Sequence, residues 1–436
     1  MFRNAKIGDK TMELDKIELE KIYSQGYGFY WKGKGQAVKD AENDGEGFID
    51  FYDGNLYIEG DNLIALKRLQ KEYKGKIKMI YIDPPYNTKK KFIYNDIFTK
   101  RKKESLSEGD RLHSNWLNMM YPRLSIARDL LTDDGAIFIS IDENEQANLK
   151  LICDDIFGEG NLVADFIWNN KYTVSNDTDV SYQHENIYCY CKNRNDFILS
   201  LLPRTEKQNK DYKNRDNDPK GPWKPTPLHA RSGNEKSLYE ITFDNGITWK
   251  APTGRYPRYS KENLQNFYKN NELYFNKNGG VDKKTYLSEV RDGVTCGTLW
   301  SYEDVGHSHG NNEEISEILG KGIFNDPKGI ELLTRIINLS VKDKTSIILD
   351  FFSGSATTAH AVMQLNAEDG GNRKYIMVQL PEPCDEKSEA YKAGYKNICE
   401  IGKERIRRAG AKIKSDESLP LENREKLDTG FKAVKL

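Results

Sequence analysis

Short apolar runs alternate with amphipathic segments along most of this chain, and the alternation predicts strands and helices in turn. The run Ile77–Ile82 is apolar and rich in β-branched residues, which is typical of a buried strand. Between residues 62 and 73, Leu63, Leu66 and Leu69 recur at helical spacing. We expect further strands at residues 56–58, 136–141, 163–168, 187–191, 346–349 and 375–380, and further helices at 116–131, 144–157, 330–341, 359–365 and 396–414. This order predicts a doubly wound, Rossmann-like α/β sheet.

The alternation stops near Ser200 and resumes near residue 323. Helical periodicity is poor in between, and residues 201–280 hold 15 Lys or Arg against nine acids, with aromatic residues scattered among them. Glycine and proline surround Arg255 and Arg258, whose guanidinium groups could read guanine edges or grip phosphates. We therefore expect an inserted target-recognition region over residues 201–322. A basic surface subdomain with no role in reading sequence is the alternative.

Composition narrows the class of protein. The 436 residues suffice for one catalytic domain and a second region. A mean hydropathy of −0.77, no apolar run of membrane-spanning length and no apolar core in residues 1–15 favour a cytoplasmic protein without a membrane partner. The net charge of −1 gives no overall signature of nucleic-acid binding, so any DNA-binding surface would have to come from local segregation of charge.

The six cysteines include no Cys-x-x-Cys pair. Cys189 and Cys191 would face the same side of a strand, and with His184 nearby a metal site is conceivable. Reduced core cysteines in a cytosolic protein are the favoured interpretation. The loop pair His307 and His309 is not expected to form a ligand set, so we expect no metal.

The most specific chemical signal is Asp-Pro-Pro-Tyr at residues 83–86. Pro84 has no N–H to donate and ends the preceding strand, which leaves Asp83 at the C-terminal tip, where open α/β sheets bind ligands. The Asp83 carboxylate and the Pro84 carbonyl can accept hydrogen bonds from one exocyclic amine, and Tyr86 can stack on the ring that carries it. Two such acceptors favour the positively charged nitrogen that forms as the amine attacks an electrophile. An ordinary Asp-Pro turn is the alternative.

A second candidate site is the loop after the strand expected at residues 346–349. Asp350 and Phe352 are followed by the small residues Ser353, Gly354 and Ser355, and such a loop lets the backbone approach a ligand closely. Many α/β folds have small residues here, so the loop alone is a weak signal. A phosphate-binding P-loop is disfavoured because no Gly-Lys-Ser/Thr follows.

These motifs resemble those of a known family. Asp-Pro-Pro-Tyr at 83–86 looks like the catalytic motif of amino-group DNA methyltransferases, and residues 59–63 with 83–88 resemble the modification subunit of Type III restriction–modification systems. The resemblance covers most of the chain and implies a methyltransferase sheet that uses S-adenosyl-L-methionine. The loop at 350–358 is similar to the family's Phe-x-Gly-x-Gly cofactor motif, with Ala356 where relatives commonly have the last glycine.

The resemblance also implies roles for residues elsewhere. Asp61 would contact the cofactor's adenine, and it can serve at the same time as a helix N-cap. Asn325 and Lys328 match the segment near the cofactor's methionine end, and Gln379 stands where relatives often place a glutamate that holds the ribose hydroxyls. The expected catalytic residues are Asp83, Pro84, Pro85 and Tyr86, and the expected cofactor-binding residues are Asp61, Asn325, Lys328, Asp350, Phe352, Ser353, Gly354, Ser355 and Gln379.

The catalytic motif precedes the cofactor loop, with the recognition region between them, and this order resembles the β group of amino-methyltransferases. Asp before Pro-Pro-Tyr favours the N6 amine of a flipped adenine as the acceptor, whereas cytosine-N4 enzymes more often carry Ser there. A cytosine-N4 or RNA methyltransferase remains an alternative, and so does a catalytically inactive DNA-binding protein, although neither Asp83 nor the glycine loop is lost. A nicotinamide dehydrogenase would have no use for Asp-Pro-Pro-Tyr.

The expected partners are double-stranded DNA, a restriction subunit and a second copy of the chain. Lys89, Lys90 and Lys91 belong to a basic, aromatic loop suited to contact DNA, with a solvated loop as the alternative. Relatives usually continue beyond residue 436, so we expect a weakened or absent homodimer. The expected regions are an N-terminal extension (1–50), a catalytic half (51–200), the recognition region (201–322), a cofactor-binding half (323–415) and a C-terminal segment (416–436).

Overall fold

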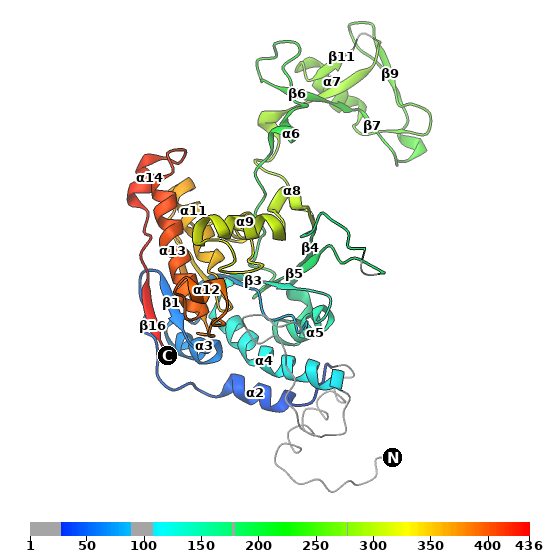
Figure 1. Ribbon diagram of the computed structural model, residues 1–436. Coiled ribbons are helices and arrows are strands. Elements are labelled where there is room, and N and C mark those ends of the chain that lie inside the picture. The colour runs from blue at the N-terminus through cyan, green and yellow to red at the C-terminus, as the bar shows by residue number, and fades with distance from the viewer. Residues whose placement is uncertain (1–27, 89–107, 177–178, 277) are drawn as a thin grey trace, which may run out of the picture. The chain divides into compact units, whose positions relative to one another are not determined.

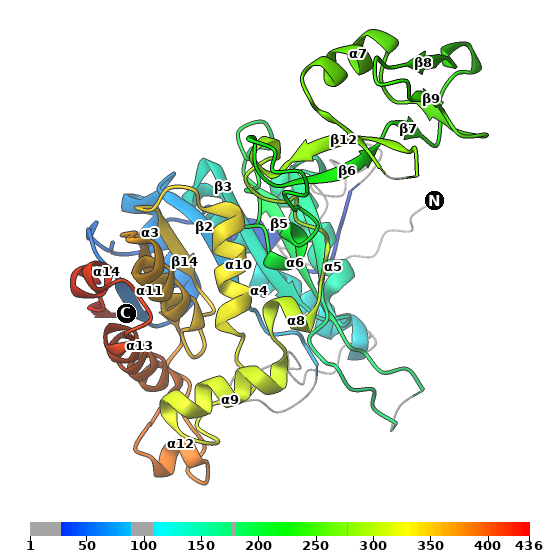
Figure 2. The ribbon, with the colours of Figure 1, turned by 90° about the horizontal axis from the view of Figure 1, so that it is seen from above.

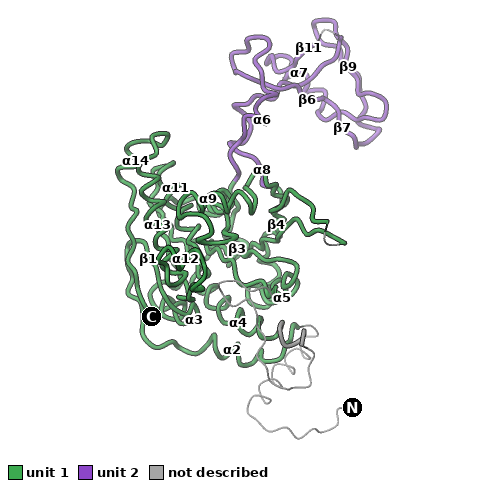
Figure 3. Tube along the Cα trace, in the orientation of Figure 1, with its two compact units in different colours: residues 1–200, 297–436 green, residues 201–296 purple. Residues whose placement is uncertain are grey.

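The computed structural model describes residues 28–88, 108–176, 179–276 and 278–436. These residues belong to two compact units, which Figure 3 shows in different colours. The first unit is formed by Met1–Ser200 and Gly297–Leu436, and the second by Leu201–Cys296. None of the helices in the described ranges has both the length and the apolar character of a membrane span.

A nine-stranded sheet forms the centre of the first unit, in the order β13-β4-β5-β3-β2-β14-β15-β1-β16 (Figure 1). The strands from β3 to β16 in this order are parallel, whereas β5 runs antiparallel to both β3 and β4. This arrangement confirms the expected α/β sheet. The bounds are Leu56–Glu59 (β1), Ile77–Ile82 (β2), Leu131–Ile141 (β3), Leu162–Trp168 (β4), Glu185–Cys191 (β5), Leu299–Trp300 (β13), Ile347–Asp350 (β14), Lys374–Gln379 (β15) and Lys432–Lys435 (β16).

Helices cover both faces of this sheet (Figures 1 and 2). On one face lie Lys34–Glu42 (α2), Asn62–Tyr73 (α3), Glu108–Leu130 (α4) and Gln146–Phe157 (α5), and on the other lie Ser308–Leu319 (α9), Ile330–Ser340 (α10), Thr357–Asp369 (α11) and Ile398–Ser415 (α13). The shorter helices are Glu159–Asn161 (η1), Tyr302–Val305 (α8), Glu389–Lys392 (α12) and Leu421–Lys426 (α14). Because both faces are covered, β2 and β15 are buried along almost their whole length, which explains their continuous apolar sequences.

The strands and helices expected from periodicity in this unit are confirmed, with shifted ends. β3 begins at Leu131, ahead of the expected start at Ala136, because the polar residues 132–134 interrupt its apolar run. α4 begins at Glu108 rather than at Trp116 and continues through Pro122. The sequence pattern gave no sign of the two short strands β13 and β16, since a strand of two to four residues is too short to establish a period.

The described part of the expected N-terminal extension, residues 28–50, packs on the first unit and includes a helix that the sequence pattern did not predict. Helix α2 packs against α4, and Trp31 and Ile49 are buried in the core of the first unit. The Trp31 indole Nε1 donates a hydrogen bond to Asn118 Oδ1 at 2.7 Å. The glycine-rich composition obscured this helix, because Gly33 serves as its N-cap with φ 98°, a conformation that favours glycine.

The second unit consists of short strands around a separate small core. Its sheets are β6-β12-β11, β7-β10 and β8-β9, and its core includes Leu228, Phe243 and Trp249. Lys284 is 1% exposed and forms salt bridges with Asp216 at 2.7 Å and Asp218 at 2.6 Å. The elements are Glu206–Asn209 (α6), Trp223–Pro227 (β6), His229–Ala230 (β7), Glu235–Ser237 (η2), Glu240–Thr242 (β8), Thr248–Lys250 (β9), Tyr256–Pro257 (β10), Lys261–Lys269 (α7), Leu273–Phe275 (β11), Val281–Tyr286 (β12) and Leu287–Glu289 (η3).

This unit ends at Cys296, whereas the sequence pattern predicts a region that runs to residue 322. Residues 297–322 belong to the first unit, because β13 pairs with β4 in the large sheet and α9 packs against α13. The pattern did not reveal this boundary, since the irregular sequence continues past it before the helical period of α9 begins.

Candidate active site

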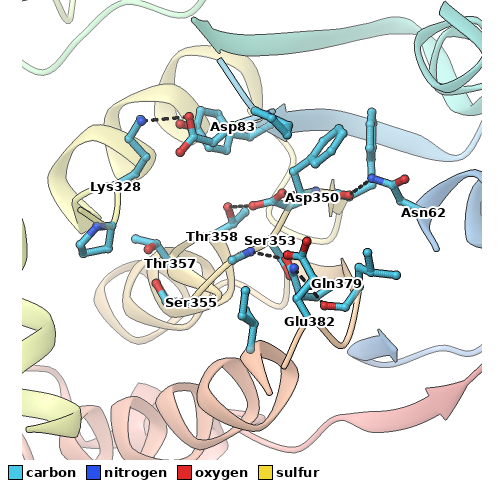
Figure 4. Close-up of a pocket in the computed structure, with 18 of the residues that line it drawn as sticks. Asn62, Asp83, Lys328, Asp350, Ser353, Ser355, Thr357, Thr358, Gln379 and Glu382 are labelled. Atoms are coloured by element: carbon cyan, nitrogen blue, oxygen red, sulfur yellow. Dashed lines mark hydrogen bonds and ion pairs between the residues drawn. The ribbon is translucent and has the colours of Figure 1, made fainter. Parts of the chain in front are cut away.

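A cavity of about 250 Å³ lies over the carboxyl ends of β2, β14 and β15 (Figure 4). Parallel pairing brings the first two ends together, because Leu349 of β14 aligns with Ile80 of β2. The cavity collects all of the expected cofactor-binding residues and two of the expected catalytic ones. These residues are Asp61, Asn325, Lys328, Asp350, Phe352, Ser353, Gly354, Ser355, Gln379, Asp83 and Pro85.

The Asp-Pro-Pro-Tyr run leaves β2 at this edge and is held in place by its neighbours. The Tyr86 hydroxyl donates to Asp83 Oδ1 at 2.5 Å and lies 3.1 Å from Glu185 Oε2. The Trp116 indole of α4 donates to the Pro85 carbonyl at 2.7 Å. Burial, and then the negative charges of Asp83 and Glu185, raise the pKa of Tyr86 well above its ordinary value, so the hydroxyl stays protonated.

Lys328 lines the cavity, and its ammonium group contacts the carboxylates of Asp83 and Glu185. Its Nζ is 2.9 Å from Asp83 Oδ1 and 3.2 Å from Glu185 Oε2, and it donates to the Tyr86 hydroxyl at 2.8 Å. The same ammonium lies 5.1 Å from the centre of the Tyr86 ring and 5.8 Å from that of Trp168. Burial disfavours the charge, but Asp83 and Glu185 outweigh this and raise the pKa of Lys328. From the sequence resemblance, Lys328 is expected near the methionine end of the cofactor.

A buried carboxylate anchors the chain just after Tyr86. Asn87 adopts φ 61°, and its Nδ2 donates to Glu145 Oε1 at 2.6 Å. Glu145 is fully buried and also contacts His113 Nδ1 at 2.8 Å and accepts from Asn148 at 2.7 Å. Asn is among the residues that tolerate a left-handed conformation best, so this turn directs the backbone away from β2 without a glycine.

The loop after β14 turns through two left-handed residues. Gly354 has φ 49°, and Ala356 has φ 63° where relatives commonly have glycine, so the turn forms despite the alanine. Arg405 of α13, which is fully buried, donates to Ser355 Oγ at 2.8 Å and Thr357 Oγ1 at 2.6 Å. These contacts connect the loop to a helix that begins more than forty residues later and fix its backbone against the cavity.

Asp350 marks the start of this loop. Its Oδ2 accepts from Thr358 Oγ1 at 2.6 Å and its Oδ1 from the Phe352 N–H at 3.1 Å. Burial raises the pKa of Asp350 to about 7, although both hydrogen bonds favour the carboxylate. The neighbouring Phe351 carbonyl accepts from Asn62 Nδ2 at 2.8 Å, which connects the loop to α3.

Asp61 is the N-cap of α3, and its Oδ1 accepts from the N–H groups of Leu63 and Ile64. This confirms the structural interpretation of that residue. Its Oδ2 lies 3.1 Å from Arg123 Nη2, and Arg123 also donates to Asn62 Oδ1 at 2.5 Å. The Asp61 side chain still lines the cavity, so a contact with a bound adenine stays compatible with the cap.

Gln379 reaches the cavity, but its amide is already engaged. The Oε1 atom accepts from the Gly354 N–H at 2.7 Å, and Nε2 donates to the Leu380 carbonyl at 3.2 Å. The half-buried Glu382 lies beside it in Figure 4 and lines the same cavity. Of the two, Glu382 is the one that offers a carboxylate. Sequence analysis missed Glu382, Glu185 and Arg405 because none of them belongs to a local motif that distinguishes them from surface charges.

The residues expected to contact DNA lie elsewhere. Lys89, Lys90 and Lys91 are outside the described residues. Arg258 is exposed in the second unit and Arg255 is half-buried, on either side of the short strand β10. Neither guanidinium group forms a hydrogen bond or ion pair with a described residue.

The cysteines and histidines do not gather around a metal-binding point in the described ranges. No group of three or more His, Cys, Asp or Glu side chains there could hold a metal ion. Cys189 and Cys191 are free thiols in the buried strand β5, where burial raises the pKa of both. This agrees with their interpretation as reduced core residues.

Asp350 generates a pH-dependent prediction for stability. Its pKa is near 3.8 in the unfolded chain and about 7 in the fold, so its contribution is complete below the lower value and is lost as pH rises through the upper one. Asp350→Asn cannot ionise. Its free energy of unfolding, relative to that of the natural chain, should rise by up to roughly 1.4 kcal/mol per pH unit between about pH 4 and 7. Urea unfolding of both chains at several pH values measures this difference. A difference between the two chains that does not change with pH would contradict the raised pKa of Asp350.

Comparison with known proteins places the site in a family. Residues 77–392 match the N6/N4-type family model described as DNA methylase. The chain is 40% identical to the Type III restriction-modification enzyme StyLTI Mod subunit of Salmonella typhimurium strain LT2, over 87% of this chain and 59% of that subunit. It is 32% identical to the EcoPI Mod subunit of Escherichia phage P1, over 92% of this chain and 71% of the relative. It is 33% identical to the Type II methyltransferase M.KpnI of Klebsiella pneumoniae, over 81% and 87%.

The match includes both halves of the cavity, since the family model begins at the start of β2 and ends after β15. The chain spans about three fifths of the length of the StyLTI Mod subunit and most of the length of M.KpnI. From these findings, this chain belongs to the N6/N4 DNA methylase family, whose members include Mod subunits of Type III restriction–modification enzymes.

Proposed function

We propose that this chain is a site-specific DNA methyltransferase that uses S-adenosyl-L-methionine to methylate the N6 amine of adenine. The observation that carries the proposal is the position of Asp83 at the rim of a cavity formed by the Gly354 loop, with Tyr86 beside it. An acceptor for an amine and a cradle for a small cofactor thus share one edge of the sheet.

The residues present fit S-adenosyl-L-methionine. The cavity combines apolar surface from Phe324, Phe352 and Leu380 with polar side chains such as Asp61, Asn325 and Glu382, which suits a molecule with an aromatic base, a ribose and a charged amino-acid end. Asn325 and the Gly354 loop would hold the amino-acid end, and Asp61 and Phe352 the adenine. Gln379 and Glu382 line the cavity side by side, and either can accept a hydrogen bond from a ribose hydroxyl.

When bound, this cofactor supplies a methyl group carried by a positively charged sulfur. Asp83 and the Pro84 carbonyl accept the two hydrogens of the target amine and hold its nitrogen at the cavity, while Tyr86 stacks on the base. The nitrogen becomes positive as it forms its new bond, and the Asp83 carboxylate stabilises that charge and is the nearest acceptor for the proton that leaves. The amine is paired inside duplex DNA, so the adenine must first be extruded.

Aspartate at position 83 supports adenine over cytosine, because the cytosine-N4 pattern more often has serine there. The family model covers both acceptors, so this finer assignment needs a direct test. The Mod relatives support a further proposal, that the chain is the modification component of a restriction–modification system and works with a restriction subunit.

We further propose that the second unit recognises the target sequence. Its residues 201–280 carry an excess of six positive charges, from 15 basic and nine acidic residues, in a chain whose net charge is −1. The unit has its own core, which allows it to present a fixed surface to DNA. The Arg258 side chain is exposed on this unit.

The central test is Asp83→Ala. Removing the acceptor at the developing charge should lower the rate of methyl transfer by about 10²–10³ while cofactor affinity largely survives. Transfer of labelled methyl to unmethylated genomic DNA gives the rate, and nucleoside analysis of the digest identifies N6-methyladenine or N4-methylcytosine. The exposed control Asp53→Ala should behave like the natural chain. Normal turnover by Asp83→Ala would refute the catalytic assignment.

Gly354→Val tests the cofactor loop. A β-branched residue is strained at φ 49°, and its side chain would alter the backbone that faces the cavity, so affinity for S-adenosyl-L-methionine should fall sharply. Calorimetry measures the affinity. Gly75→Val is the matched control, because Gly75 has φ 68° in open space on the same unit and carries a similar backbone penalty away from the cavity. Equal affinities in the two folded variants would place the cofactor elsewhere.

Arg258→Ala tests the second unit. If Arg258 contacts a phosphate, binding should weaken on all sequences and the salt dependence should flatten; if it reads a base, choice at one position should relax by roughly 1–3 kcal/mol. Mapping of methylated sites across a genome, together with binding at several salt concentrations, separates the two. Lys74→Ala removes an exposed positive charge from the first unit as a control. Unchanged sites, rate and salt slope would mean that Arg258 does not contact DNA.

A further inference from the structure

A second carboxylate faces the catalytic aspartate, and the proposed chemistry does not use it. Glu185 begins β5, the strand that runs against its neighbours, and its side chain is only 16% exposed. Its Oε1 accepts from Asn170 Nδ2 at 2.8 Å, while its Oε2 lies 3.2 Å from Lys328 Nζ and 3.1 Å from the Tyr86 hydroxyl. Both oxygens are therefore engaged, and the carboxylate has a fixed orientation.

Lys328 connects the two acids. Its ammonium lies between Asp83 Oδ1 at 2.9 Å and Glu185 Oε2 at 3.2 Å, against the Tyr86 and Trp168 rings, and Figure 4 shows the contact with Asp83. Its side chain is 10% exposed. Because the lysine is largely shielded from solvent, its contacts are with protein groups. Lys328, the two acids and Tyr86 therefore form one connected group.

The contacts on Asp83 are unequal. Oδ1 receives both the Tyr86 hydroxyl and the Lys328 ammonium, whereas no described residue donates a hydrogen bond to Oδ2. A carboxylate fixed through one oxygen presents the other in a defined direction. An incoming amine would find that oxygen already aimed, which lowers the cost of ordering the site on binding.

The charges are as important as the geometry. Two carboxylates and one ammonium leave the group with a net charge of −1, which favours a nitrogen that becomes positive. Without the lysine, the two acids would contact the same Tyr86 hydroxyl with no cation beside them to offset their repulsion. Without Glu185, the lysine would pair with Asp83 alone and cancel its charge.

We propose that Glu185 is a positioning residue for methyl transfer, which holds Lys328 and Tyr86 so that they occupy Asp83 Oδ1 and leave Oδ2 for the target amine. This inference rests on the proposed function and extends it to a residue that no local motif marks. Lys328 thereby acts on the catalytic carboxylate rather than on the cofactor's methionine end.

Other titratable groups face this site and must be separated from it. Burial first, and then the charge of Asp83, raise the pKa of Tyr81 in β2 and of Asp350 in β14. Burial first, with a smaller contribution from Glu185, raises the pKa of Asp142, which follows β3. These three are unchanged in the variants described next. A shift in the pH profile that reverses when Glu185 and Lys328 are changed together therefore reports on the pair.

The experiment is a double-mutant cycle with Glu185→Gln and Lys328→Met, measured as kcat for methyl transfer against pH. Glu185→Gln keeps the shape and should lower kcat roughly 100-fold at neutral pH, with KM for DNA and cofactor affinity changed less than about twofold. Lys328→Met should move the acid limb of the profile to higher pH. The double variant restores the net charge of −1, so its acid limb should return toward that of the natural chain, and its loss should be smaller than the product of the two single losses.

Several results would overturn the inference. Turnover of Glu185→Gln equal to that of the exposed control Glu159→Gln would remove Glu185 from the mechanism. If calorimetry shows that Glu185→Gln loses cofactor affinity, the group has only a structural role. The same conclusion follows if the acid limb of the pH profile does not move in Lys328→Met. If the natural chain itself forms no methylated nucleoside, the proposed function fails; if it is active and the cycle is additive, only this inference fails.

Discussion

The parallel pairing of β14 with β2 is the constraint on which the site depends. It brings the ends of two strands, separated by more than 250 residues of chain, to one edge of the sheet. Asp83 follows one strand and Asp350 ends the other, so the proposed amine-accepting residue and the proposed cofactor loop line one cavity. The order of these motifs along the chain is irrelevant to this outcome, because carboxyl ends of parallel strands meet whatever the connections between them.

Helices on both faces give this edge its rigidity. Trp116 of α4 holds the Pro85 carbonyl, and Arg405 of α13 holds Ser355 and Thr357 from the opposite side. A catalytic carboxylate is useful only when its direction is fixed to within a fraction of an ångström. The two helices supply that precision from the covered faces of the sheet, and the cavity itself remains open to ligands.

Charge completes the arrangement. Asp83, Glu185 and Lys328 come from three separate segments of the chain and lie within hydrogen-bonding distance of one another or of Tyr86. Burial makes each charge costly alone, and their proximity offsets the cost. The remaining negative charge matches a nitrogen that becomes positive, so the same balance that stabilises the fold also suits the proposed chemistry. The second unit has a buried ion pair of its own, Lys284 with Asp218.

The sequence by itself determined the elements with clear periodicity, the Asp83 tip and the Gly354 loop, because each depends on residues that are adjacent in the chain. It did not determine α2, the boundary at Cys296 or the role of Glu185. Helix α2 was missed because glycine-rich sequence surrounds its N-cap, Gly33. The boundary at Cys296 depends on the pairing of β13 with β4, which the local sequence does not show. Glu185 and Lys328 are 143 positions apart in the chain. They come into contact only because the fold brings β5 and the segment before α10 next to Asp83. Local patterns encode local geometry, whereas contacts between distant residues are decided by how the sheet assembles.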